Sequence, residues 1–365
     1  MNLVTFKAER FRNIRALEFS PSAGMNVIYG ENAQGKTNLL EGIYVLSTLK
    51  SFRTHQLSET VQFGEAGSFV CGTTQSARGK HELSVGIAGN EKQVLIDRKK
   101  VDATHYLGVL NVFLFSYPML EVIRGGPEER RRFIDRSIAM SKPGYLPVLM
   151  QYHRAMKQKN ALLMRVVDPR GGLNRKEAVE EIISFNQQLL ESGLEIAEQR
   201  KAYLDRLQEL LRTKQRLFFE KDLSLELELS SSFLTTRNEA QRMLEKMLDR
   251  EMQRGICLVG VHRDEIRFRV GNRELRKFGS SGQHRAFLLL MLLAQLELYE
   301  QLREDRPILL LDDLDSELDE GKILSFINEI RSRYQTLISS SRKELFSDNS
   351  DTRFYGIKSG ELEMM

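Results

Sequence analysis

The chain has 365 residues, of which 41% are hydrophobic and 28% charged, which is ordinary for a soluble globular protein with a sizeable core. The net charge of +4, from 54 basic and 50 acidic residues, does not indicate a nucleic-acid-binding protein unless a local basic patch exists. Two cysteines, no apolar run of membrane-spanning length and no signal-peptide core argue against a disulfide scaffold and a membrane protein. We therefore expect a cytoplasmic protein without a membrane partner.

The first 29 residues show patterns typical of three short strands. Residues 3–7 alternate in polarity, residues 16–19 follow a basic turn, and residues 25–29 form an apolar run. The turn, residues 9–15, holds three arginines. On pattern alone a solvated hairpin is the simpler interpretation of this turn.

A phosphate-binding loop is predicted directly after the third strand. The pattern G-x-x-x-x-G-K-T is formed by Gly30, Glu31, Asn32, Ala33, Gln34, Gly35, Lys36 and Thr37. The residues that follow, 38–46, have helical spacing, so the loop stands between a strand and a helix N-terminus that can bind an anion. We expect Lys36 to reach the β- and γ-phosphates of a nucleotide and Thr37 to bind Mg²⁺.

Residues 50–126 predict a strand-rich region. Three short alternating segments, residues 68–73, 82–88 and 93–96, are separated by glycine turns and indicate an antiparallel meander. Residues 109–115 are continuously apolar, which is typical of a strand buried on both faces.

The composition changes at residue 127, and strand signals are few until residue 254. We therefore divide the chain into residues 1–126, 127–254 and 255–365. The first helix of the middle part has a basic face formed by Arg130, Arg131, Arg132 and Arg136. These arginines are candidates to bind DNA phosphates, but pairing with neighbouring acidic residues is equally consistent with the pattern.

A long helix is predicted in the middle part of the chain. Apolar pairs recur every seven residues from residue 182 to residue 218, which gives a narrow apolar seam. Further helices are expected at residues 146–164 and 237–254, and a strand at residues 223–229. The seam favours a protruding helical arm over a plain helical bundle.

Two stretches in the last part predict the second half of an ATP site. Residues 308–311 form an apolar strand that ends in Asp312 and Asp313. Beside the phosphate-loop strand, this strand would place Asp312 near Mg²⁺ and Asp313 where a carboxylate polarises the attacking water. Upstream, Ser280, Ser281, Gly282 and Gln283 open an apolar helix and match the S-x-G-Q core of the ABC-ATPase signature. The S-x-G-Q match alone is weak evidence for an ABC ATPase. Its position between a helical insertion and an acidic strand makes it stronger evidence.

Over nearly its whole length the chain resembles the RecF family of bacterial recombination-mediator ATPases. The resemblance rests on six stretches: residues 11–13, 30–38, 125–135, 262–264, 279–283 and 311–319. It implies an α/β fold, an ABC-type P-loop ATPase head similar to those of SMC and Rad50 proteins, with a helical arm inserted. The two ends of the chain would form the head, and residues 127–254 the arm.

The resemblance also implies an activity and partners. Two ATP molecules and Mg²⁺ would be held in an ATP-dependent homodimer that hydrolyses ATP weakly, stimulated by DNA. The protein would bind duplex DNA and single-strand/duplex junctions without sequence preference and, with RecR and RecO, promote RecA loading at gaps. Lys36 and Asp313 would be catalytic, Thr37 and Asp312 would hold Mg²⁺, and Ser280 and Gln283 would act in trans. The nucleotide would also lie near Arg12, Asn13 and Asn38.

The chain departs from the family pattern at some positions, and other functions are also compatible with its sequence. Residues 117–120 and Val261 differ from the family's usual residues, and residues 339–341 are serines where transport ATPases carry a switch histidine. The chain could be a diverged ABC-type ATPase acting on a protein or membrane partner rather than DNA. A small-molecule kinase would have no use for the S-x-G-Q stretch.

Overall fold

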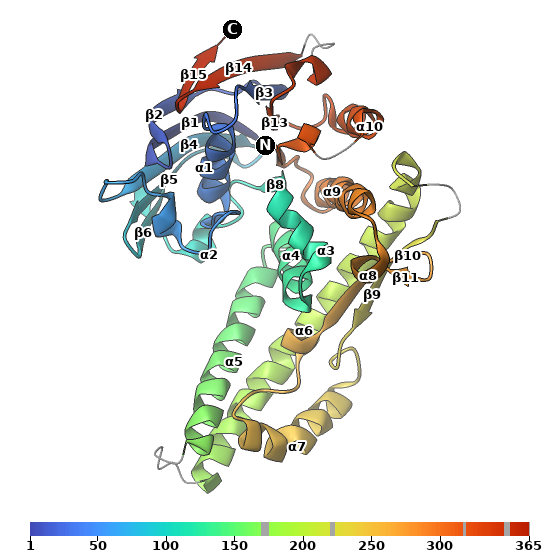
Figure 1. Cartoon of the computed structure of the whole chain (residues 1–365). Coiled ribbons are helices and arrows are strands. Elements are labelled where there is room, and N and C mark those ends of the chain that lie inside the picture. The colour runs from blue at the N-terminus through green and yellow to red at the C-terminus, as the bar shows by residue number, and fades with distance from the viewer. Residues whose placement is uncertain (169–174, 220–222, 317–318, 347–350, 365) are drawn as a thin grey trace. The chain divides into compact units, whose positions relative to one another are not determined.

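The computed structural model describes residues 1–168, 175–219, 223–316, 319–346 and 351–364 (Figure 1). The chain forms two compact units. A sheet unit comprises Met1–Arg124, Leu210–Leu223 and Leu275–Met365, and a helical unit comprises Gly125–Glu209 and Ser224–Glu274. Each unit is described by itself below.

The first sheet of the sheet unit is mostly parallel, with the order β15-β14-β3-β13-β12-β8. Its strands are β3 (Met25–Tyr29), β8 (Val112–Phe115), β12 (Ile308–Asp312), β13 (Thr336–Ser340), β14 (Thr352–Lys358) and β15 (Glu361–Met364), of which β15 is antiparallel. Strands β8, β12 and β13 are buried at every residue because helices cover both faces, as a parallel sheet requires.

This strand order corrects one expectation. The acidic strand β12 does not lie beside the phosphate-loop strand β3, because β13 lies between them. Ile338 of β13 is opposite Val27 on one side and Leu311 on the other. A buried strand before the serines at residues 339–341 is visible in the sequence, but its local pattern does not indicate that it lies between β3 and β12.

The second sheet of the sheet unit is antiparallel, with the order β2-β1-β4-β5-β6-β7. Its strands are β1 (Asn2–Phe11), β2 (Ile14–Phe19), β4 (Ser68–Ser76), β5 (Gly79–Ala88), β6 (Glu91–Ile96) and β7 (Lys99–Lys100). Burial alternates along β4 because only one face of this sheet packs on the core. The predicted meander is confirmed.

Helix α1 (Lys36–Thr48) contacts strands of both sheets, so it is buried almost all round. Its side chains Ile43 and Leu46 belong to one core with Phe6 of β1 and Leu310 of β12. A Cβ atom at Gly42 would come within 2.9 Å of the Phe6 ring, so glycine permits this close packing. The other helices of this unit are α2 (Ala103–Tyr106), α3 (Glu121–Arg124), α8 (Leu275–Phe278), α9 (Ser281–Arg303) and α10 (Glu320–Ile330).

The helical unit contains α4 (Pro127–Ser141), α5 (Tyr145–Val167), most of α6 (Arg175–Lys214) and α7 (Arg237–Arg254). Helix α6 runs alongside α5 in the opposite direction, with α7 beside them (Figure 1). Ile182, Leu189, Ile196 and Tyr203 are buried at the predicted seven-residue spacing, whereas the adjacent Ile183 is 54% exposed. The long helix with a narrow apolar seam is therefore confirmed.

A small sheet with the order β11-β10-β9 completes the helical unit. It consists of β9 (Leu225–Ser230), β10 (Glu265–Val270) and β11 (Arg273–Glu274). Because β10 pairs with β9, residues 255–274 join the helical unit, whereas the composition placed them with the last part of the chain. The predicted division into residues 1–126, 127–254 and 255–365 does not coincide with the boundaries of these two compact units. As a division into domains it stays a prediction.

A buried ion cluster ties the helical unit together. Arg200 of α6 is 2% exposed, and its Nε and Nη2 atoms each donate to Asp135 of α4 at 2.8 Å. Its Nη1 atom donates to Asp264 at 2.6 Å and to the carbonyl of Val261 at 2.7 Å. Burial raises the pKa of Asp264, and the charge of Arg200 opposes that rise.

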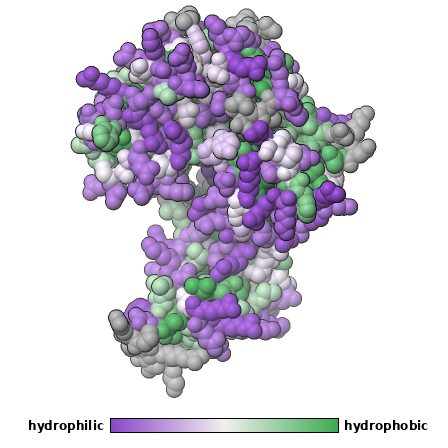
Figure 2. All heavy atoms as spheres, in the orientation of Figure 1, coloured by the Kyte–Doolittle hydropathy of each residue, from purple (hydrophilic) through white to green (hydrophobic). Residues whose placement is uncertain are grey.

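Hydrophilic side chains cover most of the molecular face shown in Figure 2, with hydrophobic side chains gathered in small areas. Within the described ranges, no helix is both long enough and apolar enough to cross a membrane.

We expect Arg200→Met to destabilise the helical unit by about 3–5 kcal/mol, since two carboxylates would remain buried without their cation. The loss should be smaller at pH 5 than at pH 8, because protonation neutralises Asp264, whose pKa is already raised by burial. Urea unfolding at the two pH values measures both effects. The control is Lys201→Met, which removes an exposed ion pair with Asp205. Equal destabilisation by both variants would contradict the role assigned to Arg200.

Candidate nucleotide-binding site

The phosphate loop occupies the connection from β3 to α1, as the motif predicted. Gly30 has φ 156°, and a Cβ atom there would lie 2.5 Å from the carbonyl oxygen of Ile357. Gly35 has φ 116° and is the N-cap of α1. Beside the loop is an open depression of about 570 Å³, lined by Tyr29, Gly30, Glu31, Asn32 and Ser341. A helix N-terminus at such a depression suits a phosphate group.

Lys36 lies inside the loop and is 9% exposed. Its Nζ atom donates to the carbonyl oxygens of Gly30 at 2.6 Å and Glu31 at 2.9 Å. Burial lowers the pKa of Lys36, and Asp313 and Asp315 act in the opposite direction. The ammonium group is thus desolvated and already placed where phosphate oxygens can replace the two carbonyls.

Thr37 and Asp312 meet although they are 275 residues apart. The Thr37 hydroxyl donates to Oδ1 of Asp312 at 2.9 Å, and the Ser339 hydroxyl donates to the same oxygen at 2.7 Å. Asp312 is 8% exposed, and burial raises its pKa. The described residues contain no cluster of three potential metal ligands. Mg²⁺ commonly takes one or two protein oxygens and completes its shell with phosphate and water, so a hydroxyl and a carboxylate such as those of Thr37 and Asp312 suit it.

Asp313 follows in a constrained backbone conformation. Its φ is 54°, in the left-handed region, and its N–H donates to the Ser339 hydroxyl at 2.9 Å. Its side chain is exposed, unlike that of Asp312. Asp315 is buried and accepts a hydrogen bond from Ser340 at 2.8 Å. Of the predicted S-x-L-D stretch at residues 316–319, residues 317–318 lie outside the described residues.

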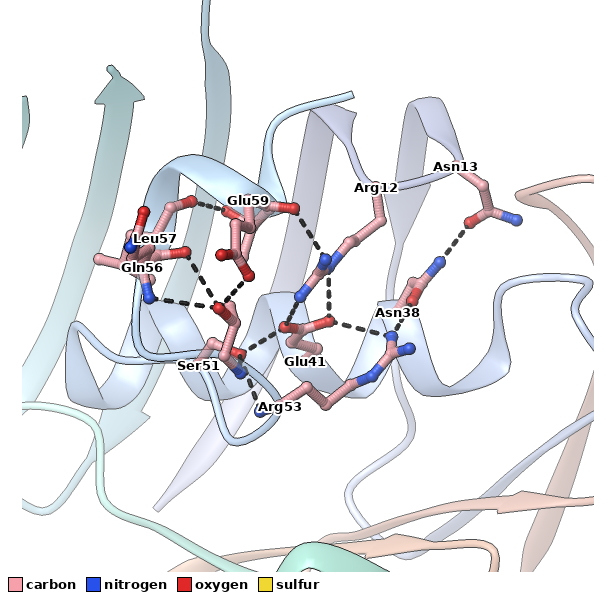
Figure 3. Close-up of polar contacts among 11 residues, drawn as sticks. Arg12, Asn13, Asn38, Glu41, Ser51, Arg53, Gln56, Leu57 and Glu59 are labelled. Carbon is pink, nitrogen blue, oxygen red and sulfur yellow. Dashed lines mark hydrogen bonds and ion pairs between the residues drawn. The ribbon is translucent and has the colours of Figure 1, made fainter. Parts of the chain in front are cut away.

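A hydrogen-bonded cluster connects the β1–β2 turn to the first turns of α1 (Figure 3). The Arg12 guanidinium donates to both carboxylate oxygens of Glu41, at 3.0 and 2.7 Å, and to the carbonyl of Glu59 at 2.7 Å. Glu41 is fully buried and also accepts from Ser51 at 2.5 Å and Arg53 at 3.4 Å. The solvated interpretation of the turn is wrong for Arg12, whose side chain is 20% exposed.

The same cluster extends to the loop through two asparagines. Asn38 donates to the Asn13 side chain at 2.7 Å, and Asn13 in turn donates to the carbonyl of Ala33 at 3.4 Å. Arg53 donates to Asn38 at 2.7 Å (Figure 3). The structure thus brings the predicted residues Arg12, Asn13 and Asn38 together at the loop.

Sequence reasoning missed three contributors to this site. Glu41 and Arg53 complete the cluster, and the Gln34 side chain accepts a hydrogen bond from the N–H of Ser359 at 2.7 Å. A signal existed for Glu41, since it is a single acid among apolar residues of a helix. No local pattern indicates Ser359, which is 325 residues from its partner.

The signature residues lie at the start of α9. Ser280 caps the helix by accepting from the N–H of Gln283 at 3.2 Å, and Gln283 accepts from the N–H of Ser280 at 2.9 Å. Ser280, Ser281 and Gly282 are exposed. Within the part of the chain that the structure describes, no hydrogen bond or ion pair connects them to the phosphate loop. One chain alone therefore does not join the signature to Lys36.

The arginines predicted to bind DNA have different surroundings. Arg130 is 2% exposed and donates to the carbonyl of Ile266 at 2.5 Å and to Glu265 at 2.9 Å, which argues against a phosphate contact. Arg131 donates to the carbonyl of Asp264 at 2.6 Å. Arg132 is 57% exposed but pairs with Glu128 and Glu129, and Arg136 is half-buried. DNA binding by these residues stays a prediction.

Comparison with known proteins gives consistent results over the whole chain. Residues 2–364 match the family model described as RecF/RecN/SMC N terminal domain. The DNA replication and repair protein RecF of Geobacter sp. (strain M21) is 32% identical, covering 99% of this chain and 100% of the relative. The protein of that name from Staphylococcus aureus (strain JH9) is 34% identical over the same shares.

Two solved structures illustrate the fold. The structure of the recombination mediator protein RecF-ATP in the RecFOR pathway has a TM-score of 0.89 at 28% identity, covering 100% of this chain and 99% of that one. The Smc head domain from Pyrococcus furiosus has a TM-score of 0.57 at 14% identity, covering 100% and 95%, and supports the fold alone. The ABC-type, SMC-like head with a helical insertion is confirmed.

Glu41→Gln should lower the free energy of unfolding of the sheet unit by about 1–3 kcal/mol, because Arg12 and Arg53 lose a buried, charge-assisted acceptor. Thermal or urea unfolding measures the change. The matched control is Glu18→Gln, whose carboxylate pairs with Lys7 on the surface and should contribute less than about 1 kcal/mol. If both variants lost the same stability, the anchoring role of Glu41 would be wrong.

Proposed function

Because the chain belongs to the RecF family, we propose that it is an ATP-dependent DNA-binding recombination mediator that acts as a homodimer. The observation that carries the proposal is the exposure of the signature residues Ser280, Ser281 and Gly282 at the N-terminus of α9, where the described residues of the same chain form no hydrogen bond or ion pair between them and the phosphate loop. A nucleotide on the loop would lack the signature unless a second chain supplied it.

ATP would bind with its phosphates on the loop and at the N-terminus of α1. The Lys36 ammonium would exchange the carbonyls of Gly30 and Glu31 for oxygens of the β- and γ-phosphates, an exchange that needs little movement. Thr37 and Asp312 would hold Mg²⁺, which when bound neutralises part of the phosphate charge. The pairing of these two oxygens at 2.9 Å supports this assignment.

Hydrolysis would release ADP and phosphate after water attacks the γ-phosphorus. Asp313 would accept a hydrogen bond from that water and orient it, since its carboxylate follows the Mg²⁺ carboxylate directly and is exposed. Ser339 and Ser340 are occupied by Asp312 and Asp315, and no histidine stands among residues 339–341. A weak, DNA-dependent ATPase is consistent with this arrangement.

The signature would act across the dimer interface. The N-terminus of α9 presents exposed small residues, Ser281 and Gly282, which allow a γ-phosphate to approach closely. Ser280 and Gln283 would contact the ATP held by the partner chain. Two ATP molecules would then join two chains, and hydrolysis would separate them.

The dimer would hold duplex DNA and single-strand/duplex junctions through the phosphate backbone. Such binding should depend on salt and not on base sequence. Arg132 and Arg136 remain candidate contacts, with Arg131 partly engaged by the protein. With RecR and RecO the protein would promote RecA loading at gaps. The names of its relatives, which refer to DNA replication and repair and to the RecFOR pathway, support this role.

A second candidate is a diverged ABC-type ATPase that acts on a protein or membrane partner. One observation favours this second candidate over a DNA-binding protein. Arg130 and Arg132, two of the four predicted DNA contacts, are engaged with carboxylates of the protein itself. The experiment below separates the two candidates.

We expect ATP with Mg²⁺ to drive dimer formation and to tighten binding to a gapped duplex by about tenfold or more, because both composite sites form only in the dimer. Light scattering follows the dimer and fluorescence anisotropy follows the DNA. Lys36→Met and Ser280→Arg should each abolish the gain. Lys201→Met, an exposed change on α6, is the control.

ATP-dependent dimers with flat, weak DNA affinity would remove the DNA function and favour a protein or membrane partner. Dimers that form equally well without ATP, or with Ser280→Arg, would contradict the proposed role of the signature.

A further inference from the structure

A cavity lies at the amino ends of the parallel strands, in the sheet unit. Its volume is about 620 Å³, and it is bordered by the segments that lead into β3, β13 and β14. The phosphate loop follows the carboxyl end of β3, after Tyr29, whereas the cavity is lined by Gly24 and Met25 at its amino end. The cavity and the nucleotide site therefore lie at opposite ends of the parallel strands.

Four arginines from three segments of the chain line this cavity. They are Arg306 before β12, Arg331 and Arg333 before β13, and Arg353 at the start of β14. Among the described lining residues Asp351 is the single acid. The parallel topology brings these four residues to the same cavity, although they are spread over residues 306–353 of the sequence.

The arginines are incompletely neutralised by the protein. Arg333 pairs with Glu300 at 3.1 Å, and Arg306 lies 3.8 Å from the same carboxylate. Among the residues that the structure describes, Arg331 and Arg353 have no carboxylate within 4.0 Å. The Nε atom of Arg331 is buried and has no hydrogen-bond partner there, and the same holds for the hydroxyl of Ser22, which also lines the cavity.

These features have a common physical consequence. A concave surface with excess positive charge concentrates the field and attracts anions. Guanidinium groups match the paired oxygens of phosphate better than an ammonium group does. A volume of this size is within the range of ordinary small-ligand sites.

We propose that this arginine-lined cavity binds a phosphate-bearing anion, at a site separate from the nucleotide site. The phosphate could belong to a small molecule or to the backbone of a nucleic acid. Arg331 and Arg353 would bind the phosphate oxygens. The site does not depend on the proposed ATP cycle.

The first arm of the test uses pyrophosphate as the small-molecule probe. The full chain is saturated with ADP, so that the phosphate loop is filled, and pyrophosphate is titrated by calorimetry. The wild-type protein should bind it at one further site. The double variant Arg331→Glu/Arg353→Glu should lose at least tenfold in affinity, whereas Arg98→Glu, an exposed arginine on the other sheet, should not.

The second arm uses duplex DNA at several salt concentrations, followed by anisotropy. If the phosphate is that of DNA, the double variant should bind at least tenfold more weakly, and its log–log salt slope should fall by about two. Unchanged ADP affinity shows that the variant is folded. Should it fail this check, Arg331→Gln/Arg353→Gln replaces it.

Loss of affinity in either arm supports the site and identifies the source of the phosphate. The proposal is overturned if no second pyrophosphate site is found and the double variant binds DNA as Arg98→Glu does. Because the calorimetric arm needs neither ATP hydrolysis nor dimerisation, its result is independent of the function proposed above.

Discussion

The burial of α1 between two sheets is the constraint on which the nucleotide site depends. Most helices on a sheet show one apolar face, but α1 packs against both sheets and is buried almost all round. Its N-terminus carries the phosphate loop, so the position of the loop is fixed by the packing of a whole core. Residues from three distant segments then meet the loop: Asn13 from the β1–β2 turn, Asp312 from β12 and Ser359 from the β14–β15 turn.

The charged groups Lys36 and Asp312 are buried, and each is hydrogen-bonded to neutral groups of the protein. Lys36 donates to carbonyls of its own loop, and Asp312 accepts from two hydroxyls, so neither charged group is buried without a hydrogen-bond partner. Both groups are desolvated, and burial lowers the pKa of Lys36 and raises the pKa of Asp312. The arrival of phosphate and Mg²⁺ would supply the opposite charges that favour the ionised forms.

Local patterns predicted most elements, because they depend on spacing within a single segment. The phosphate loop, the meander and helix α7 at residues 237–254 were all visible as periodicity or as a motif. The predictions that failed concern pairing between distant segments. That β13 separates β12 from β3, and that β10 pairs with β9, follow from contacts across dozens to hundreds of residues. Arg12 looked solvated because Glu41, its partner, belongs to another element.

The central claim is that each ATP site is built from two chains. Mixing Lys36→Met with Ser280→Arg protein tests it most directly. Each variant alone would lack both sites, but in a mixed dimer the loop of the Ser280→Arg chain faces the intact signature of the Lys36→Met chain. Because neither variant dimerises with itself on ATP, the dimers in an equal mixture would be mixed and each would hold one of two sites, so the account predicts recovery of up to about half of wild-type ATPase activity. No recovery, in a mixture shown to contain mixed dimers, would contradict it.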